Sequence, residues 1–80
     1  MEKRVGVAII QIENREYVPL LNEIISNHSQ IIIGRQGLPR SNGQNIISLV
    51  LEGTTDQISS LTGQLGRLRA IQIKSVLLKT

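Results

Sequence analysis

Residues 45–66 read "NIISLVLEGTTDQISSLTGQLG" and predict a strand followed at once by a helix. The first nine of them are mostly branched and apolar, which is typical of a strand buried in a protein core. Thr54 or Thr55 can then cap a helix with its side-chain oxygen, and Gly66 marks the end of that helix. The apolar positions of the helix follow helical spacing and are Ile58, Leu61 and Leu65.

The first half of the chain repeats this pattern forty residues earlier. Residues 3–13 predict another buried strand, and Asn14 can cap a first helix. Proline disrupts a helix beyond its first turn, so Pro19 implies that this turn is irregular or that the helix begins nearer Val18. The apolar positions of the helix are Val18, Leu21, Ile24, Ile25 and His28.

Each half ends in a further predicted strand, at residues 30–36 and 70–78. Two βαβ units in tandem are the signature of an α+β ferredoxin-like βαββαβ sandwich. In this fold a four-stranded antiparallel sheet carries two helices on one face. Residues 1–80 are expected to form a single domain, because a chain of this length supports only one modest core.

Positions related by the repeat should point the same way, which assigns the faces of the first and third strands. Val7 and Ile9, together with Ile47 and Leu49, are predicted to lie beneath the helices. The alternate positions would face water in a monomer, and they are Gly6, Ala8, Ile10, Ile46, Ser48 and Val50. This second set is too apolar for a solvated sheet face, which predicts a homo-oligomer, a dimer or tetramer, assembled through the sheet. The alternative is an exposed patch of small residues that the monomer tolerates.

Composition favours a protein of the reducing cell interior. There is no cysteine, so disulfides and thiolate metal sites are excluded, and a cytoplasmic location is expected. No stretch approaches the roughly 20 apolar residues that span a bilayer, and the N-terminal residues lack a signal-peptide pattern. The net charge of +3 comes from scattered residues, and Tyr17 is the one aromatic side chain. These features disfavour a membrane partner and nucleic acid.

Catalytic and metal-binding patterns are weak, so we expect no enzyme activity, no cofactor and no metal site. The only histidine, His28, lies on the apolar face of the first helix, where a structural role is favoured over a catalytic one. The acidic residues fall mostly at strand ends and in first helical turns, where the helix dipole accounts for them. They include no close pair.

The stretch "GRQGLPRSNG", residues 34–43, can be a simple strand connection or a binding loop. It lacks the lysine followed by serine or threonine of a Walker phosphate-binding loop, and a strand follows it instead of a helix. Its glycines and the "SNG" turn signal suit a hairpin. Arg35 matches the small Ser75 in the repeat, so structure alone does not require a guanidinium there. It can pair across a subunit interface, face solvent, or bind a small anion.

From Gly34 onward the chain resembles the iron-only hydrogenase system regulators. The likeness rests on "GRQGLP" at residues 34–39, "IISLVLEGTTDQISSLTGQLGRL" at residues 46–68 and "IKS" at residues 73–75, with Asn14 and Arg15 earlier. The resemblance implies an ACT-like fold, similar also to the C-terminal domain of nickel-responsive regulators. Such modules assemble through their sheets and bind effectors at subunit interfaces. Nickel regulators use several histidines and a cysteine, so nickel binding of that kind is excluded here.

The sequence thus predicts a homo-oligomeric, ACT-like regulatory module with a small anionic effector or a regulatory protein as partner. The predicted effector or interface residues are Gly34, Arg35, Gly37, Pro39, Gly63 and Gly66. One alternative is direct nucleic-acid binding through Arg35, Arg40, Arg67 and Arg69. A weaker alternative is an acylphosphatase-like enzyme of the same fold.

Overall fold

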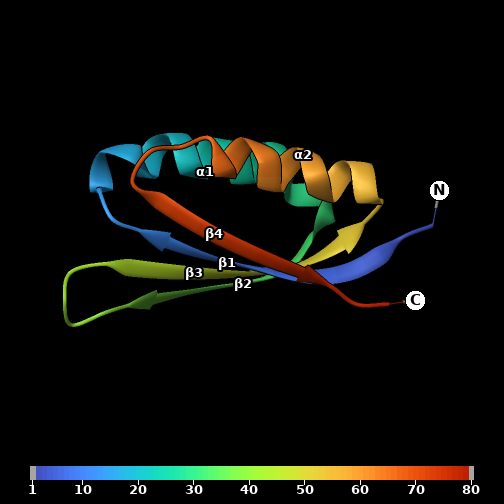
Figure 1. The fold of residues 1–80 in the computed structure, drawn as a ribbon, viewed down its shortest axis with the longest axis horizontal. Coiled ribbons are helices and arrows are strands. Elements are labelled where there is room, and N and C mark those ends of the chain that lie inside the picture. Colours follow the sequence, from blue (N-terminus) through green and yellow to red (C-terminus); the bar gives the residue numbers. More distant parts are fainter. Residues whose placement is uncertain (1, 80) are drawn as a thin grey trace.

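A computed structural model describes residues 2–79 as one sheet covered by two helices on a single side (Figure 1). The elements in chain order are β1 (Arg4–Ile12), η1 (Arg15–Tyr17), α1 (Val18–Asn27), η2 (Ser29–Ile31), β2 (Ile32–Pro39), β3 (Asn45–Gly53), α2 (Thr55–Gly66) and β4 (Ile71–Leu77). The strand order is β2-β3-β1-β4, and all neighbours are antiparallel. The predicted ferredoxin-like fold is confirmed.

Local capping sets where both helical segments begin. The Thr54 hydroxyl accepts a hydrogen bond from the Gln57 amide at 3.2 Å, and the Gln57 side chain accepts one from the Thr54 amide at 2.9 Å. This capping box satisfies two amides that the start of α2 would leave unpaired. Asn14 accepts from the Glu16 amide at 2.9 Å and so caps the 3-10 turn η1. The first helix therefore has an irregular entry, and α1 proper begins at Val18 with Pro19 in its first turn.

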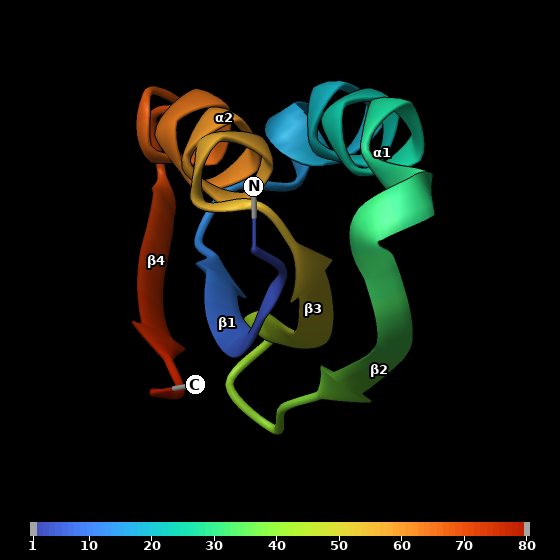
Figure 2. The same cartoon turned by 90° about the vertical axis from the view of Figure 1, so that its right-hand side faces the viewer.

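The core lies between the helices and the sheet (Figure 2). Each strand of the central pair sends alternate side chains into it, since Ala8 lies opposite Leu49 and Ile10 lies opposite Ile47. The buried apolar residues are Ala8, Ile10, Ile12, Leu21, Ile24, Ile25, Ile31, Ile47, Leu49, Leu51, Ile58, Leu61, Leu65 and Ile71. No helix within residues 2–79 is long and apolar enough to cross a membrane.

The predicted faces of β1 are wrong. Gly6, Ala8 and Ile10 are buried beneath the helices, and Val7 and Ile9 are exposed on the other side, at 42% and 50%. The prediction for β3 is correct, because Ile47 and Leu49 are buried while Ile46, Ser48 and Val50 occupy the side away from the helices.

The reason is one extra residue in the first half of the repeat. Ile12 ends β1 and is followed by Glu13 before the capping residue Asn14, whereas Gly53 ends β3 and is followed directly by Thr54. The helices keep the forty-residue offset, but the strands are displaced by one position. A displacement of one residue moves every side chain of a strand to the opposite face.

Gly6 of β1 lies so close to β4 that there is no room for a side chain. A Cβ atom there would lie 2.7 Å from the backbone oxygen of Val76 and 2.5 Å from Cδ2 of Leu77. We expect Gly6→Ala to lower the free energy of unfolding by about 1–3 kcal/mol, because the backbone of β4 would have to shift. Urea denaturation measures this change.

Gly63 provides the matched control for this substitution. Nothing lies within 4 Å of its Cβ position, and it sits inside α2. Gly63→Ala should therefore raise stability by roughly 0.5–1 kcal/mol through the higher helix propensity of alanine. Equal stability of Gly6→Ala and the unmodified protein would contradict the close approach of the two strands.

Candidate functional site

The side of the sheet away from the helices, called the open face below, is uncovered in the single chain. Its members follow from the strand register and the alternating burial. They are Val5, Val7, Ile9 and Gln11 of β1, Ile46, Ser48, Val50 and Glu52 of β3, Gly34, Gln36 and Leu38 of β2, and Gln72, Lys74 and Val76 of β4.

One half of the open face is apolar. Val7 lies directly between Val50 on β3 and Val76 on β4, so three valines form a row across the sheet. Val76 is 63% exposed. A shallow hollow of about 200 Å³ lies over this row, and apolar side chains form nearly all of its lining. Water therefore meets a continuous apolar surface in the monomer.

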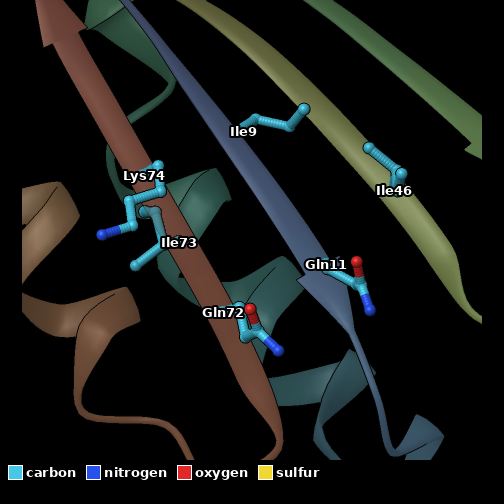
Figure 3. A pocket seen from close by; sticks show the side chains of 6 residues that line it. All are labelled: Ile9, Gln11, Ile46, Gln72, Ile73 and Lys74. Atoms are coloured by element: carbon cyan, nitrogen blue, oxygen red, sulfur yellow. The ribbon is translucent and has the colours of Figure 1, made fainter.

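The other half of the open face mixes apolar and amide side chains. A hollow of about 130 Å³ lies between β4, β1 and β3. Figure 3 shows its lining side chains, with Ile9 and Ile46 above the paired Gln11 and Gln72. The Gln11 side chain donates to the side-chain oxygen of Gln44 at 2.7 Å and accepts from Arg40 at 3.3 Å. The hairpin loop is thereby tied to this end of the open face.

The strands place one cation and one anion on the open face. Lys74 on β4 lies beside Ile9, and Glu52 on β3 lies beside Val5. The strand residues of this face therefore carry no net charge. A neutral and largely apolar surface is poorly suited to a polyanion and well suited to another surface of the same kind.

The predicted connection "GRQGLP" is itself part of a strand. β2 continues to Pro39 and pairs with β3 as far as Asn45, and only residues 40–44 form the turn. The amide of Arg40 donates to the carbonyl of Gln44 at 3.2 Å, and Gly43 has a positive φ of 84°, as the turn signal predicted. Glycine tolerates this conformation without strain.

The strand pattern divides the predicted site residues between two sides of the sheet. Gly34 faces Val50 on the open face, with Gln36 and Leu38 after it. Arg35 points to the helix side instead. Gly37 and Pro39, two and four residues further along β2, lie on that same side. The four residues predicted in this segment therefore do not form one site.

Arg35 borders a groove on the helix side, between the start of α1 and the extended β2–β3 hairpin. One guanidinium nitrogen, Nη2, donates to the Asn22 side-chain oxygen at 3.2 Å. This groove, called the Arg35 groove below, has a volume of about 270 Å³. It is lined by Ile12, Val18, Asn22, Arg35, Gly37, Leu38, Pro39, Asn45, Ile46 and Ile47. An exposed cation thus borders a mainly apolar hollow.

Gly63 and Gly66 do not line this groove. Both belong to α2, which packs over β4, whereas α1 lies over the β2 side of the sheet (Figure 2). The structure therefore does not bring Gly63 and Gly66 together with Arg35.

The four arginines of the nucleic-acid alternative are also divided. The segments that carry Arg40, Arg67 and Arg69 lie at one end of the molecule (Figure 1). Arg35 lies further along β2, beside α1. The structure therefore does not gather the four arginines into one basic surface.

His28 is held by two hydrogen bonds at the end of α1. Its Nδ1 lies 2.8 Å from the carbonyl oxygen of Ile24, which can only accept, so Nδ1 carries the proton. Nε2 then accepts from the Ser60 hydroxyl at 3.2 Å and links the two helices. No group of three or more histidine, aspartate or glutamate side chains within residues 2–79 is arranged to hold a metal ion.

Sequence reasoning missed Val7, Ile9 and Val76 on the open face and Asn22 beside Arg35. The first two are exposed because of the extra residue at Glu13, and no residue propensity marks where β1 ends before it. No local signal could have revealed the contact between Arg35 and Asn22, which are brought together only by packing of α1 on the sheet.

Residues 4–75 match one family model, TM1266-like, with the description "Iron-only hydrogenase system regulator, putative". The structure of the uncharacterized protein TM1266 from Thermotoga maritima is similar at 34% sequence identity and a TM-score of 0.91, over 98% of this chain and 100% of that one. No curated protein matches the sequence.

Two more distant structures share the fold. The ACT domain of a GTP pyrophosphokinase from Chlorobium tepidum has 16% identity and a TM-score of 0.67, over 100% of this chain and 91% of that one. A nitrogen regulatory PII-like protein from Thiomonas intermedia, solved with ADP, AMP and bicarbonate, has 8% identity and a TM-score of 0.50, over 99% and 100% of the two chains. These likenesses support an ACT-like arrangement.

Proposed function

Because the chain belongs to the TM1266-like family of iron-only hydrogenase system regulators, we propose that it is a homo-oligomeric, effector-binding regulator of such a system. The observation that carries the oligomeric part is the open face. Antiparallel sheets that face water usually carry alternating polar side chains, but this face presents Val7, Val50 and Val76 in one row. Covering that row removes apolar area worth about 25 cal/mol per Å² from water.

A second copy of the same chain is the occupant that best fits the open face. Glu52 lies beside Val5 in the end row of the face, and Lys74 lies two rows further along beside Ile9, so two copies turned against one another can oppose unlike charges. Such an interface is self-complementary, as two-fold symmetry requires. Buried charges that lack partners would oppose assembly, and this arrangement leaves none on the strands.

The regulator acts by binding rather than by catalysis. The single histidine, His28, uses both ring nitrogens in hydrogen bonds, Nδ1 to the Ile24 carbonyl within α1 and Nε2 to Ser60 on α2. A general base needs a free nitrogen within reach of a substrate proton. We place the protein in the cytoplasm, in keeping with its cysteine-free sequence.

Deleting the protein from a host that contains the hydrogenase tests the proposal. We expect hydrogenase transcript level or enzyme activity to change in the deletion strain and to return with the unmodified gene. Ile9→Lys, which disrupts the open face, should fail to restore it. The control Leu20→Lys lies on α1, away from that face, and should restore it. Unaltered transcript and activity after deletion would contradict the regulatory function.

A further inference from the structure

We propose that the Arg35 groove binds a small amphipathic monocarboxylate, with its carboxylate on Arg35 and its apolar body in the groove. This inference rests on the proposed effector-binding function and names the class of effector. The residues that carry it are Arg35, Asn22, Gly37 and the apolar wall.

The anionic end of the ligand is assigned by the guanidinium. Arginine has five N–H donors, and the hydrogen bond formed by Arg35 goes to the neutral amide of Asn22 at 3.2 Å. That bond positions the side chain without neutralising its charge. A planar guanidinium fork matches the two oxygens of a carboxylate, and charge-assisted bonds of this kind are stronger than neutral ones.

The groove supplies one positive charge for the ligand. Its remaining polar side chains are the amides of Asn22 and Asn45, and no lysine or second arginine is among its lining residues. One fixed charge is balanced by the single negative charge of a carboxylate. A phosphate ester, which carries more charge at neutral pH, would be left partly uncompensated.

The body of the ligand is assigned by the walls and the size of the groove. Ile12, Val18 and Ile47 form the apolar wall under α1, and Pro39 continues it along β2. Sites for drug-sized ligands have volumes of roughly 300–1,000 Å³, so a hollow of about 270 Å³ is suited to a smaller molecule. A carboxylic acid with about four to eight carbons fits this limit.

Gly37 keeps the groove open. It lines the hollow, and no atom lies within 4 Å of the position that its Cβ would occupy. A larger residue can therefore be placed there without a clash in the fold, and its side chain would fill space that the ligand needs. Gly37→Val is thus a blocking variant that leaves Arg35 intact.

The test is a two-dimensional ¹H–¹⁵N NMR titration with straight and branched monocarboxylates from butanoate to octanoate. For 4-methylpentanoate we expect saturable shifts of the amides around Arg35, Gly37 and Val18. The neutral isostere 4-methylpentanamide should bind at least tenfold more weakly.

The variants separate the two parts of the site. Arg35→Gln should weaken binding of 4-methylpentanoate at least tenfold, and Gly37→Val should abolish it. Their matched controls are Arg40→Gln, in the hairpin loop, and Gly63→Val, a glycine of α2 that also has open space around it. Both controls should bind as the unmodified protein does.

The inference is overturned if no acid of the series gives saturable shifts at the groove. It is also overturned if the amide, or the Arg35→Gln variant, binds equally well. Loss of the oligomer in Arg35→Gln, measured by light scattering, would instead assign Arg35 to a subunit interface and overturn the ligand site. Failure of the titration leaves the deletion phenotype and the oligomer unaffected, so it is distinguishable from failure of the proposed function.

Discussion

Ile9→Lys should convert the oligomer into a folded monomer. Ile9 is 50% exposed on the open face, so a lysine at this position can reach water in the single chain. In the assembled protein the ammonium group would be buried against the apolar surface of the second copy. A buried charge without a partner costs several kcal/mol, which is enough to dissociate an interface of moderate strength. Light scattering at micromolar concentration measures the mass, and circular dichroism checks the fold.

Leu20→Lys is the matched control for this prediction. Leu20 is a similarly exposed aliphatic residue, at 44%, but it lies on α1 at the other side of the molecule. The Leu20→Lys protein should assemble as the unmodified protein does. If the Ile9→Lys protein retained the mass of the unmodified oligomer, the open face would not be the interface.

Ile10→Lys should unfold the protein, whereas Ile9→Lys at the neighbouring position should leave it folded. The Ile10 side chain is 0% exposed and packs opposite Ile47 beneath the helices. Lysine there would place its charge in the core, and the loss of apolar packing would add to that cost. Domains are stable by roughly 0.05–0.15 kcal/mol per residue, which is about 4–12 kcal/mol for 80 residues. A penalty of about 4 kcal/mol or more removes at least a third of this stability, and all of it at the lower limit.

The measurement is the near- and far-ultraviolet circular dichroism of Ile10→Lys, followed by urea denaturation. Ile10→Val is the control, because it removes one methylene and should cost only about 0.5–1.5 kcal/mol. A cooperatively folded Ile10→Lys protein beside an unfolded Ile9→Lys protein would reverse the two faces of β1. The repeat in the sequence predicted that reversed arrangement.

The parts of the fold that depend on neighbouring residues were predictable from sequence. The capping box at Thr54 and the helical spacing of Ile58, Leu61 and Leu65 predict α2 from residues that all lie in or next to the helix. The start of α1 was predictable in the same way, because Pro19 restricts where a helix can begin. Each of these signals acts over one or two turns of chain.

The parts that depend on register or on long-range packing were not predictable. One additional residue at Glu13 reverses the faces of β1, and no propensity marks that difference. The strand β2 extends through Gly37 and Pro39, two residue types depleted in strands, because β3 provides a pairing partner for every residue from Gly34 to Pro39. The placement of Asn22 beside Arg35 depends on how α1 lies on the sheet.

Native mass spectrometry of the unmodified protein, purified from its own host, tests the central claim most directly. The open face predicts a particle whose mass is a multiple of the 8.8 kDa chain, a dimer or tetramer, at micromolar concentration. The same spectrum reports any small acid that remains bound to the protein. A single species of 8.8 kDa at that concentration would contradict assembly through the open face.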